Sequence, residues 1–256
     1  MKNIVIQVIV IIIGIFLCVA LSSYIGYALI KDIIPIENIQ NQKNLSQKIE
    51  DDNQNKIQKE HITNKRNTLD HNKLMIVAHP DDDTIFGGAH LIEDDYTVVC
   101  VTCGVVDYRL NEFSKAMKYS GDKYLYLSHT DLDPKAHISD WTDEKETINL
   151  ELKQIIESQD WDLIVSHNPE GEYGHKHHKM ISEMVTKNIS DKSKLYYFGK
   201  YKEKGTIDDT PKLKENIFKK KKEMLSIYKS QPACSEDSRL SYSFNHENWI
   251  KYSDWK

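Results

Sequence analysis

The hydrophobic and polar positions of this chain divide it into three stretches. Residues 4–30 carry no charged side chain, residues 31–72 are rich in Asn, Gln, Lys, Glu and Asp, and residues 73–256 alternate apolar runs with amphipathic stretches. The first run exceeds the roughly 20 residues that a helix needs to cross a bilayer. We therefore expect a single-pass membrane anchor over residues 1–30, a polar stalk over 31–72 and a folded domain over 73–256.

A cleaved signal peptide is the alternative for the N-terminal run, since Lys2 supplies a positive charge in front of it. The run is longer than an h-region of about 7–15 residues, and no clear small-x-small cleavage site follows it. An uncleaved anchor is favoured. Positive charge is only slightly in excess on the N-terminal side of the anchor. This slight bias favours an extracytoplasmic location for the folded domain.

Periodicity in the folded domain predicts strands alternating with helices. Such alternation is typical of an α/β fold with a doubly wound, largely parallel sheet and helices on both faces. The predicted strands are 74–78, 97–102, 123–128, 162–166 and 195–199, and the predicted helices are 83–92, 109–120, 143–158, 175–189 and 212–229.

The first polar cluster follows the first predicted strand, in the stretch LMIVAHPDDDTIFGG of residues 74–88. Pro80 has no N–H for a sheet ladder, so the strand stops where His79 and the aspartates 81–83 appear. Three adjacent carboxylates repel one another unless a cation lies among them. The alternative is a solvated acidic turn that caps the next helix.

The second polar cluster follows the fourth predicted strand and reads SHNPEGEYGHKHHK over residues 166–179. His175 and His178 share one face of the predicted helix, and His177 is predicted to lie on the surface. In a doubly wound sheet the first and fourth strands are neighbours, so the two clusters should meet beyond their carboxyl ends. A His/Asp pair from one strand and a His from the other would give a catalytic zinc site with an open position.

These two motifs resemble the PIG-L/LmbE-like N-acetylglucosaminyl de-N-acetylases, and the resemblance spans residues 73–232. It rests on AHPDDD with its trailing GG and on EYGHKHH, with weaker support from Thr102-Cys-Gly, Arg109-x-x-Glu112 and Tyr228-Lys-Ser-Gln231. It implies a Rossmann-like fold and hydrolysis of an acetamide. The chain departs from the family at Asp83, where a glutamate is usual.

The resemblance also implies the ligands and the base. His79, Asp82 and His178 would hold Zn2+, with Fe2+ as the alternative ion, and Asp81 would be the general base. Zinc lowers the pKa of a bound water towards about 7, and an unligated carboxylate beside it can accept the proton.

The remaining roles follow from the same resemblance. A protonated His175, helped by Tyr173, would stabilise the oxyanion, and Arg109 would lie on the substrate side. Alternatively, Arg109 would pair with Glu112 on its own helix. The carboxylate that orients His175 is left open among Glu172, Asp208 and Asp209.

The net charge of −5 disfavours a nucleic-acid-binding protein. The absence of nucleotide-binding, serine hydrolase and H-E-x-x-H motifs disfavours nucleotide-binding proteins, serine hydrolases and thermolysin-like metalloproteases. We expect no nucleic acid partner. The expected partner is an N-acetylated sugar conjugate, lipid-linked or from the cell envelope. The alternatives are an amidase acting on another N-acyl group and a catalytically silent glycan-binding protein.

Three further patterns have ordinary structural interpretations. Cys100 and Cys103 lie in an apolar run, which favours small buried thiols over a redox or zinc pair. The basic run 219–222 is expected to be a solvated helix face. The aromatic residues after Gln231 are expected to pack against the domain.

Overall fold

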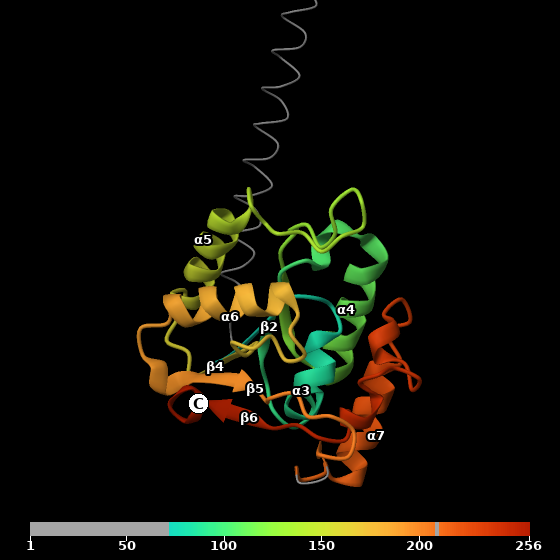
Figure 1. Ribbon diagram of the computed structural model, residues 1–256. Helices are drawn as coiled ribbons and strands as arrows, with labels where there is room; N and C mark the ends of the chain where they lie inside the picture. The colour runs from blue at the N-terminus through green and yellow to red at the C-terminus, as the bar shows by residue number, and fades with distance from the viewer. Residues whose placement is uncertain (1–71, 208–209) are drawn as a thin grey trace, which may run out of the picture. The chain divides into compact units, whose positions relative to one another are not determined.

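The computed structural model describes residues 72–207 and 210–256 (Figure 1). The predicted anchor, and the stalk apart from residue 72, lie outside this part. Within it, no helix is both long enough and apolar enough to span a bilayer. The strands are β1 (Lys73–Val77), β2 (Thr97–Cys100), β3 (Lys123–Tyr126), β4 (Leu163–Ser166), β5 (Leu195–Phe198) and β6 (Trp249–Lys251); the helices are α3 (Asp82–Glu93), α4 (Asp107–Ser120), α5 (Lys145–Ile156), α6 (Lys176–Asn188) and α7 (Glu215–Leu225).

The sheet has the order β3-β2-β1-β4-β5-β6. Its first five strands are parallel, and β6 runs antiparallel to β5. All five predicted strands are confirmed, within two residues at each end. The sixth was missed because it has only three residues and follows a polar stretch.

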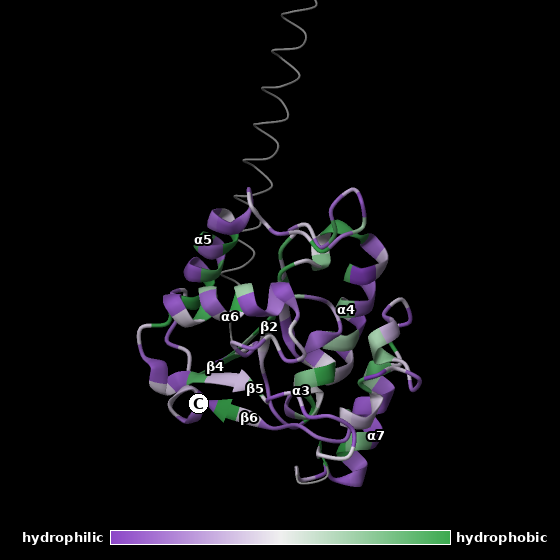
Figure 2. Cartoon of the chain, viewed as in Figure 1, coloured by the Kyte–Doolittle hydropathy of each residue, from purple (hydrophilic) through white to green (hydrophobic). Residues whose placement is uncertain are grey.

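The helices cover both faces of the sheet (Figure 1). α5 and α6 pack on one face with the core that contains Trp141 and Trp161, while α3, α4 and α7 pack on the other with Phe113 and Tyr228. The predicted apolar spacing of α5 is confirmed, because Ile148, Leu152, Ile155 and Ile156 are buried. In Figure 2 the green, hydrophobic stretches of the helices are interrupted by purple ones, as expected of helices that bury one side.

The glycine pair in α3 allows close packing. A Cβ on Gly87 would lie 2.4 Å from Cε of Met75, and one on Gly88 would lie 3.2 Å from Cγ of Lys221. α3 therefore approaches both β1 and α7 closely. This holds the N-terminal turn of α3, which carries the aspartate cluster, against the end of β1.

The C-terminal segment packs on the domain as predicted. Trp249 stacks on His90 with ring centroids 3.6 Å apart, and Trp255 contacts Tyr197 edge to face at 5.5 Å. The prediction of a wholly solvated basic run in α7 is wrong at Lys221. Its ammonium is buried and donates to the carboxylate of Glu247 and to a carbonyl of α3.

The cysteine prediction is confirmed. Cys100 and Cys103 are free thiols with no exposed surface in the core beneath α4. Burial, followed by the neighbouring Cys103 thiol, raises the pKa of Cys100 well above its usual range.

Candidate metal centre and active site

The two polar clusters meet at the carboxyl ends of β1 and β4, as the predicted topology requires. β1 and β4 are hydrogen-bonded neighbours in parallel register, with Ile76 opposite Ser166. His79 lies just past β1 and Asp82 begins α3, while His178 lies in the first turn of α6. All three side chains are buried.

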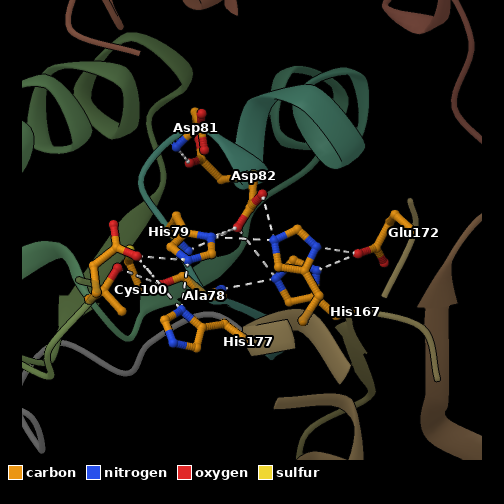
Figure 3. A network of polar contacts seen from close by, with 12 residues as sticks. Ala78, His79, Asp81, Asp82, Cys100, His167, Glu172 and His177 are labelled. Atoms are coloured by element: carbon orange, nitrogen blue, oxygen red, sulfur yellow. Dashed lines mark hydrogen bonds and ion pairs between the residues drawn. The ribbon is translucent and has the colours of Figure 1, made fainter. Parts of the chain in front are cut away.

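Three potential ligand groups converge in this buried space (Figure 3). Nδ1 of His79 is 3.1 Å from Oδ2 of Asp82 and 3.3 Å from Nε2 of His178, and Nε2 of His178 is 3.3 Å from Oδ1 of Asp82. In a tetrahedral zinc site with bonds of about 2.0–2.2 Å, neighbouring donor atoms lie about 3.3 Å apart. The donor types of the predicted ligand set therefore fit zinc, and the spacings are close to this value, with Oδ2 of Asp82 nearest His79 and Oδ1 nearest His178.

Glu172 fixes which nitrogen His178 offers. Nδ1 of His178 is 2.5 Å from Oε2 of Glu172, and a carboxylate can only accept, so Nδ1 carries a proton and Nε2 is the nitrogen left to bind an ion. His167 contacts the same carboxylate oxygen through Nδ1 at 3.0 Å, and its Nε2 accepts the backbone N–H of Ala78. Glu172 was a candidate for orienting His175; its imidazole partners are His178 and His167 instead.

The neighbouring imidazoles keep the carboxylates of Glu172 and Asp82 ionised. Burial alone would raise the pKa of Glu172, but His167 and then His178 lower it to about 2. Burial likewise opposes ionisation of Asp82, yet His178 and His167 hold its pKa well below the usual range. The carboxylate available to a cation is thus charged at neutral pH.

Asp131 faces the other side of His79 and was not predicted. Its Oδ1 lies 3.4 Å from Nε2 of His79, and its Oδ2 lies 2.5 Å from Nη1 of Arg109. The alternative that Arg109 pairs with Glu112 is wrong, because Glu112 accepts hydrogen bonds from Ser230. Nε of Arg109 is buried and lacks a hydrogen-bond partner among the described residues.

The prediction of a surface position for His177 is wrong. Its side chain is buried, and its ring stacks on Trp141 with centroids 3.9 Å apart. Nε2 of His177 lies 2.9 Å from the carbonyl oxygen of Ser139, and Nδ1 lies 3.0 Å from Nε2 of His79. The prediction failed because His175 is the extended N-cap of α6 rather than part of the helix, and because the 129–141 loop covers this face.

His175 and Tyr173 adjoin the ligand group. The ring centroid of His175 lies 4.5 Å from that of His178 and 4.7 Å from that of His79, and Tyr173 meets His178 edge to face at 5.7 Å. Burial, then the neighbouring histidines, lowers the pKa of His175 to about 3, so the ring is neutral at pH 7. This contradicts the expected protonated ring. Its Nδ1 is buried without a hydrogen-bond partner among the described residues.

Asp81, the expected base, is the N-cap of α3 and has an unusual backbone. Its φ of 130° lies in the region that favours glycine, which costs of the order of 1–3 kcal/mol and is common at functional sites. The side chain is buried, and burial and the Asp82 charge raise its pKa well above the usual range. Such a carboxylate is a stronger proton acceptor than an ordinary aspartate.

Asp83 reaches a neighbouring element despite being shorter than glutamate. Its carboxylate accepts hydrogen bonds from the hydroxyl of Tyr228, at 2.8 and 2.9 Å, and from the hydroxyl of Thr84 at 2.7 Å. Burial raises the pKa of Asp83 to about 6. The weaker motif around Tyr228 thus supports the aspartate turn.

Comparison with known proteins found similarity in sequence and in fold. A protein of Acanthamoeba polyphaga mimivirus, uncharacterised protein L374, is 33% identical over 127 residues, which are 44% of this chain and 56% of that protein. The crystal structure of the A40926 pseudoaglycone deacetylase Dbv21 gives a TM-score of 0.53 at 14% identity, over 71% of this chain and 98% of that one.

The zinc-inhibited form of teicoplanin deacetylase Orf2 gives a TM-score of 0.50 at 14% identity, over 67% of this chain and 90% of that one. These two structures share the fold. In sequence, residues 74–189 match the family described as GlcNAc-PI de-N-acetylase. This stretch contains β1 to β4, both polar clusters and every residue of the predicted site. Over residues 74–189, the chain is therefore similar to the PIG-L family of de-N-acetylases.

Proposed function

We propose that this protein is a metal-dependent N-deacetylase that hydrolyses the acetamide of an N-acetylglucosamine-type glycoconjugate, releasing acetate and a free amine. The observation that carries the proposal is the convergence of Nδ1 of His79, the Asp82 carboxylate and Nε2 of His178 within 3.3 Å of one another. A divalent ion held there, Zn2+ or Fe2+, would polarise the acetamide carbonyl and acidify a water molecule.

Asp81 is the proposed general base. Its buried carboxylate, with a raised pKa, accepts a proton from the attacking water and returns it to the departing amine nitrogen. Two difficult proton transfers are then handled by one group. The strained backbone at Asp81 supports the assignment, because residues held in such conformations cluster at active sites.

His175 is the proposed oxyanion partner, assisted by Tyr173. A neutral imidazole can polarise a carbonyl oxygen by donating one ring N–H, so the low pKa of His175 is compatible with this role. Arg109 is proposed to contact the substrate. Its partnerless Nε would gain an acceptor from a sugar oxygen while Nη1 stays bonded to Asp131.

The proposed substrate is an N-acetylated sugar conjugate close to a membrane. The family supports the sugar, since its description names GlcNAc-PI. Residues 4–30, which carry no charge, support a membrane anchor, and the slight basic bias around them favours the domain on the extracytoplasmic side. Retention of the full chain in a carbonate-washed membrane fraction, with protease access from outside, would be the expected result.

The test uses the full-length chain, stripped of metal and reloaded with zinc. We expect stoichiometric zinc in the parent and in Asp81→Asn, with amine release from N-acetylglucosamine conjugates slowed by about 10²–10⁴-fold in the variant. Asp95→Asn, at an exposed residue beyond α3, is the matched control and should behave as the parent.

Other outcomes would contradict the proposal in different ways. Zinc binding with amine release only from N-acyl compounds that lack the sugar would favour the amidase alternative. A parent that binds neither Zn2+ nor Fe2+ would exclude the metal mechanism and favour the glycan-binding alternative. Equal activity in the parent and in Asp81→Asn would remove Asp81 from the mechanism.

A further inference from the structure

The Ser139 carbonyl determines the tautomer of His177. Nε2 of His177 lies 2.9 Å from that oxygen, which can only accept, so Nε2 carries a proton. The ring is buried, and its nearest carboxylate oxygen, on Asp131, is 3.7 Å from Nδ1. Without a carboxylate at hydrogen-bond distance the buried ring is neutral, and its Nδ1 has a lone pair.

This lone pair determines the tautomer of His79 in turn. Nδ1 of His177 lies 3.0 Å from Nε2 of His79, and two lone pairs would repel at that distance. Nε2 of His79 therefore carries a proton and donates it to His177. The Oδ1 of Asp131 is farther from Nε2, at 3.4 Å, beyond the usual range of an N–H···O bond. His177 is thus the principal acceptor.

We propose that His177 is a positioning residue: by accepting a hydrogen bond from Nε2 of His79, it commits Nδ1 of His79 to the metal. The inference rests on the proposed ligand group of His79, Asp82 and His178. Nδ1 is the nitrogen of His79 that faces this group, 3.1 Å from Asp82 and 3.3 Å from His178. A metal-ligating histidine needs such a partner on its second nitrogen to hold its tautomer and ring orientation.

The 129–141 loop orients His177. Trp141 is 1% exposed, its ring lies parallel to that of His177, and its Nε1 donates to the carbonyl of Thr130 at 2.7 Å. The loop also supplies Ser139 and Asp131. One irregular segment therefore holds the outer side of His79, while Glu172 holds the outer side of His178.

Two substitutions separate hydrogen bonding from packing. His177→Phe keeps a ring against Trp141 and removes the acceptor, whereas His177→Asn removes the ring and retains an acceptor near the place of Nδ1. His137→Phe, at an exposed histidine of the same loop, is the matched control. Zinc affinity is measured by titration of the metal-free full chain against a competing chelator, and long-range 1H–15N correlation of 15N-histidine protein reports which ring nitrogens carry protons.

We expect the parent to show a proton on Nε2 of His79. Zinc affinity should fall about 10–100-fold in His177→Phe and stay within about threefold of the parent in His177→Asn. The Nε2 proton should exchange faster in His177→Phe alone.

The opposite order, with His177→Asn weakened and His177→Phe unchanged, would show that packing matters and would overturn the inference. A parent proton found only on Nδ1 of His79 would do the same. A parent that binds neither Zn2+ nor Fe2+ would overturn the proposed function as well, so the two failures are distinguishable.

Discussion

Replacing Glu172 by glutamine tests the carboxylate that orients His178. Oε2 of Glu172 receives Nδ1–H groups from His178 at 2.5 Å and from His167 at 3.0 Å, while Oε1 accepts the backbone N–H of Asn168 at 2.9 Å. A glutamine has one oxygen for these three donors. Whichever way it turns, its NH2 group faces at least one N–H.

The expected consequence is weaker metal binding. If the NH2 group faces the rings, His178 gains a hydrogen-bond partner only by moving its proton to Nε2, the nitrogen that faces the proposed ion. We expect zinc affinity to fall about 10–100-fold, which is about 1.4–2.7 kcal/mol. The assay is zinc titration of the metal-free full chain against a competing chelator.

Glu170→Gln is the matched control, because it makes the same substitution two residues earlier. The Glu170 carboxylate is largely exposed and pairs only with Lys200, at 3.3 Å, among the described residues. An exposed pair of this kind contributes about 0–1 kcal/mol, so zinc affinity should not change. Zinc affinity in Glu172→Gln within twofold of the parent would refute the reasoning.

Three further predictions concern stability and reactivity. Glu247→Gln is expected to lower the free energy of unfolding in urea by about 3–5 kcal/mol, because the buried ammonium of Lys221 would lose its counter-charge and keep only neutral oxygens as partners. Lys221→Met should cost less, since Glu247 keeps backbone and imidazole donors; the reverse order would contradict this. Burial raises the pKa of Asp122 to about 7, so the folded state binds its proton more tightly than the unfolded state. Stability should therefore fall by about 2–3 kcal/mol from pH 5 to pH 8, and equal pH profiles of the parent and Asp122→Asn would exclude this cause. Cys100 should not react with a thiol reagent in the folded protein, and rapid labelling without urea would contradict its burial.

The sequence was sufficient to bring the two polar clusters together because the relevant signals are local. A short apolar run that ends in His79 or in the 166–179 motif marks a strand end. The rule that the first and fourth strands are neighbours then brings His79, Asp82 and His178 together. The order of the sheet confirms this rule. No side-chain detail was needed for that step.

The groups behind the ligands could not be predicted in the same way. Asp131 lies in an irregular loop, where no periodicity relates a residue to a partner far along the chain. His177 was misplaced because the phase of α6 depends on its N-cap, and because only the folded loop shows Trp141 covering it. Lys221 looked solvated because its partner, Glu247, is supplied by the distant C-terminal segment.

The meeting of His79 and His178 also bears on how long the protein survives in a cell. They are 99 residues apart in the chain, while their facing nitrogens are 3.3 Å apart. An ion bound by both would act as a reversible cross-link between β1 and α6, and at 1,000 times its dissociation constant it would add about 4 kcal/mol to folding stability. Since losses of about 1–2 kcal/mol can change cellular abundance several-fold, metal starvation would expose the protein to proteolysis. Metal supply would then set the amount of enzyme as well as its activity.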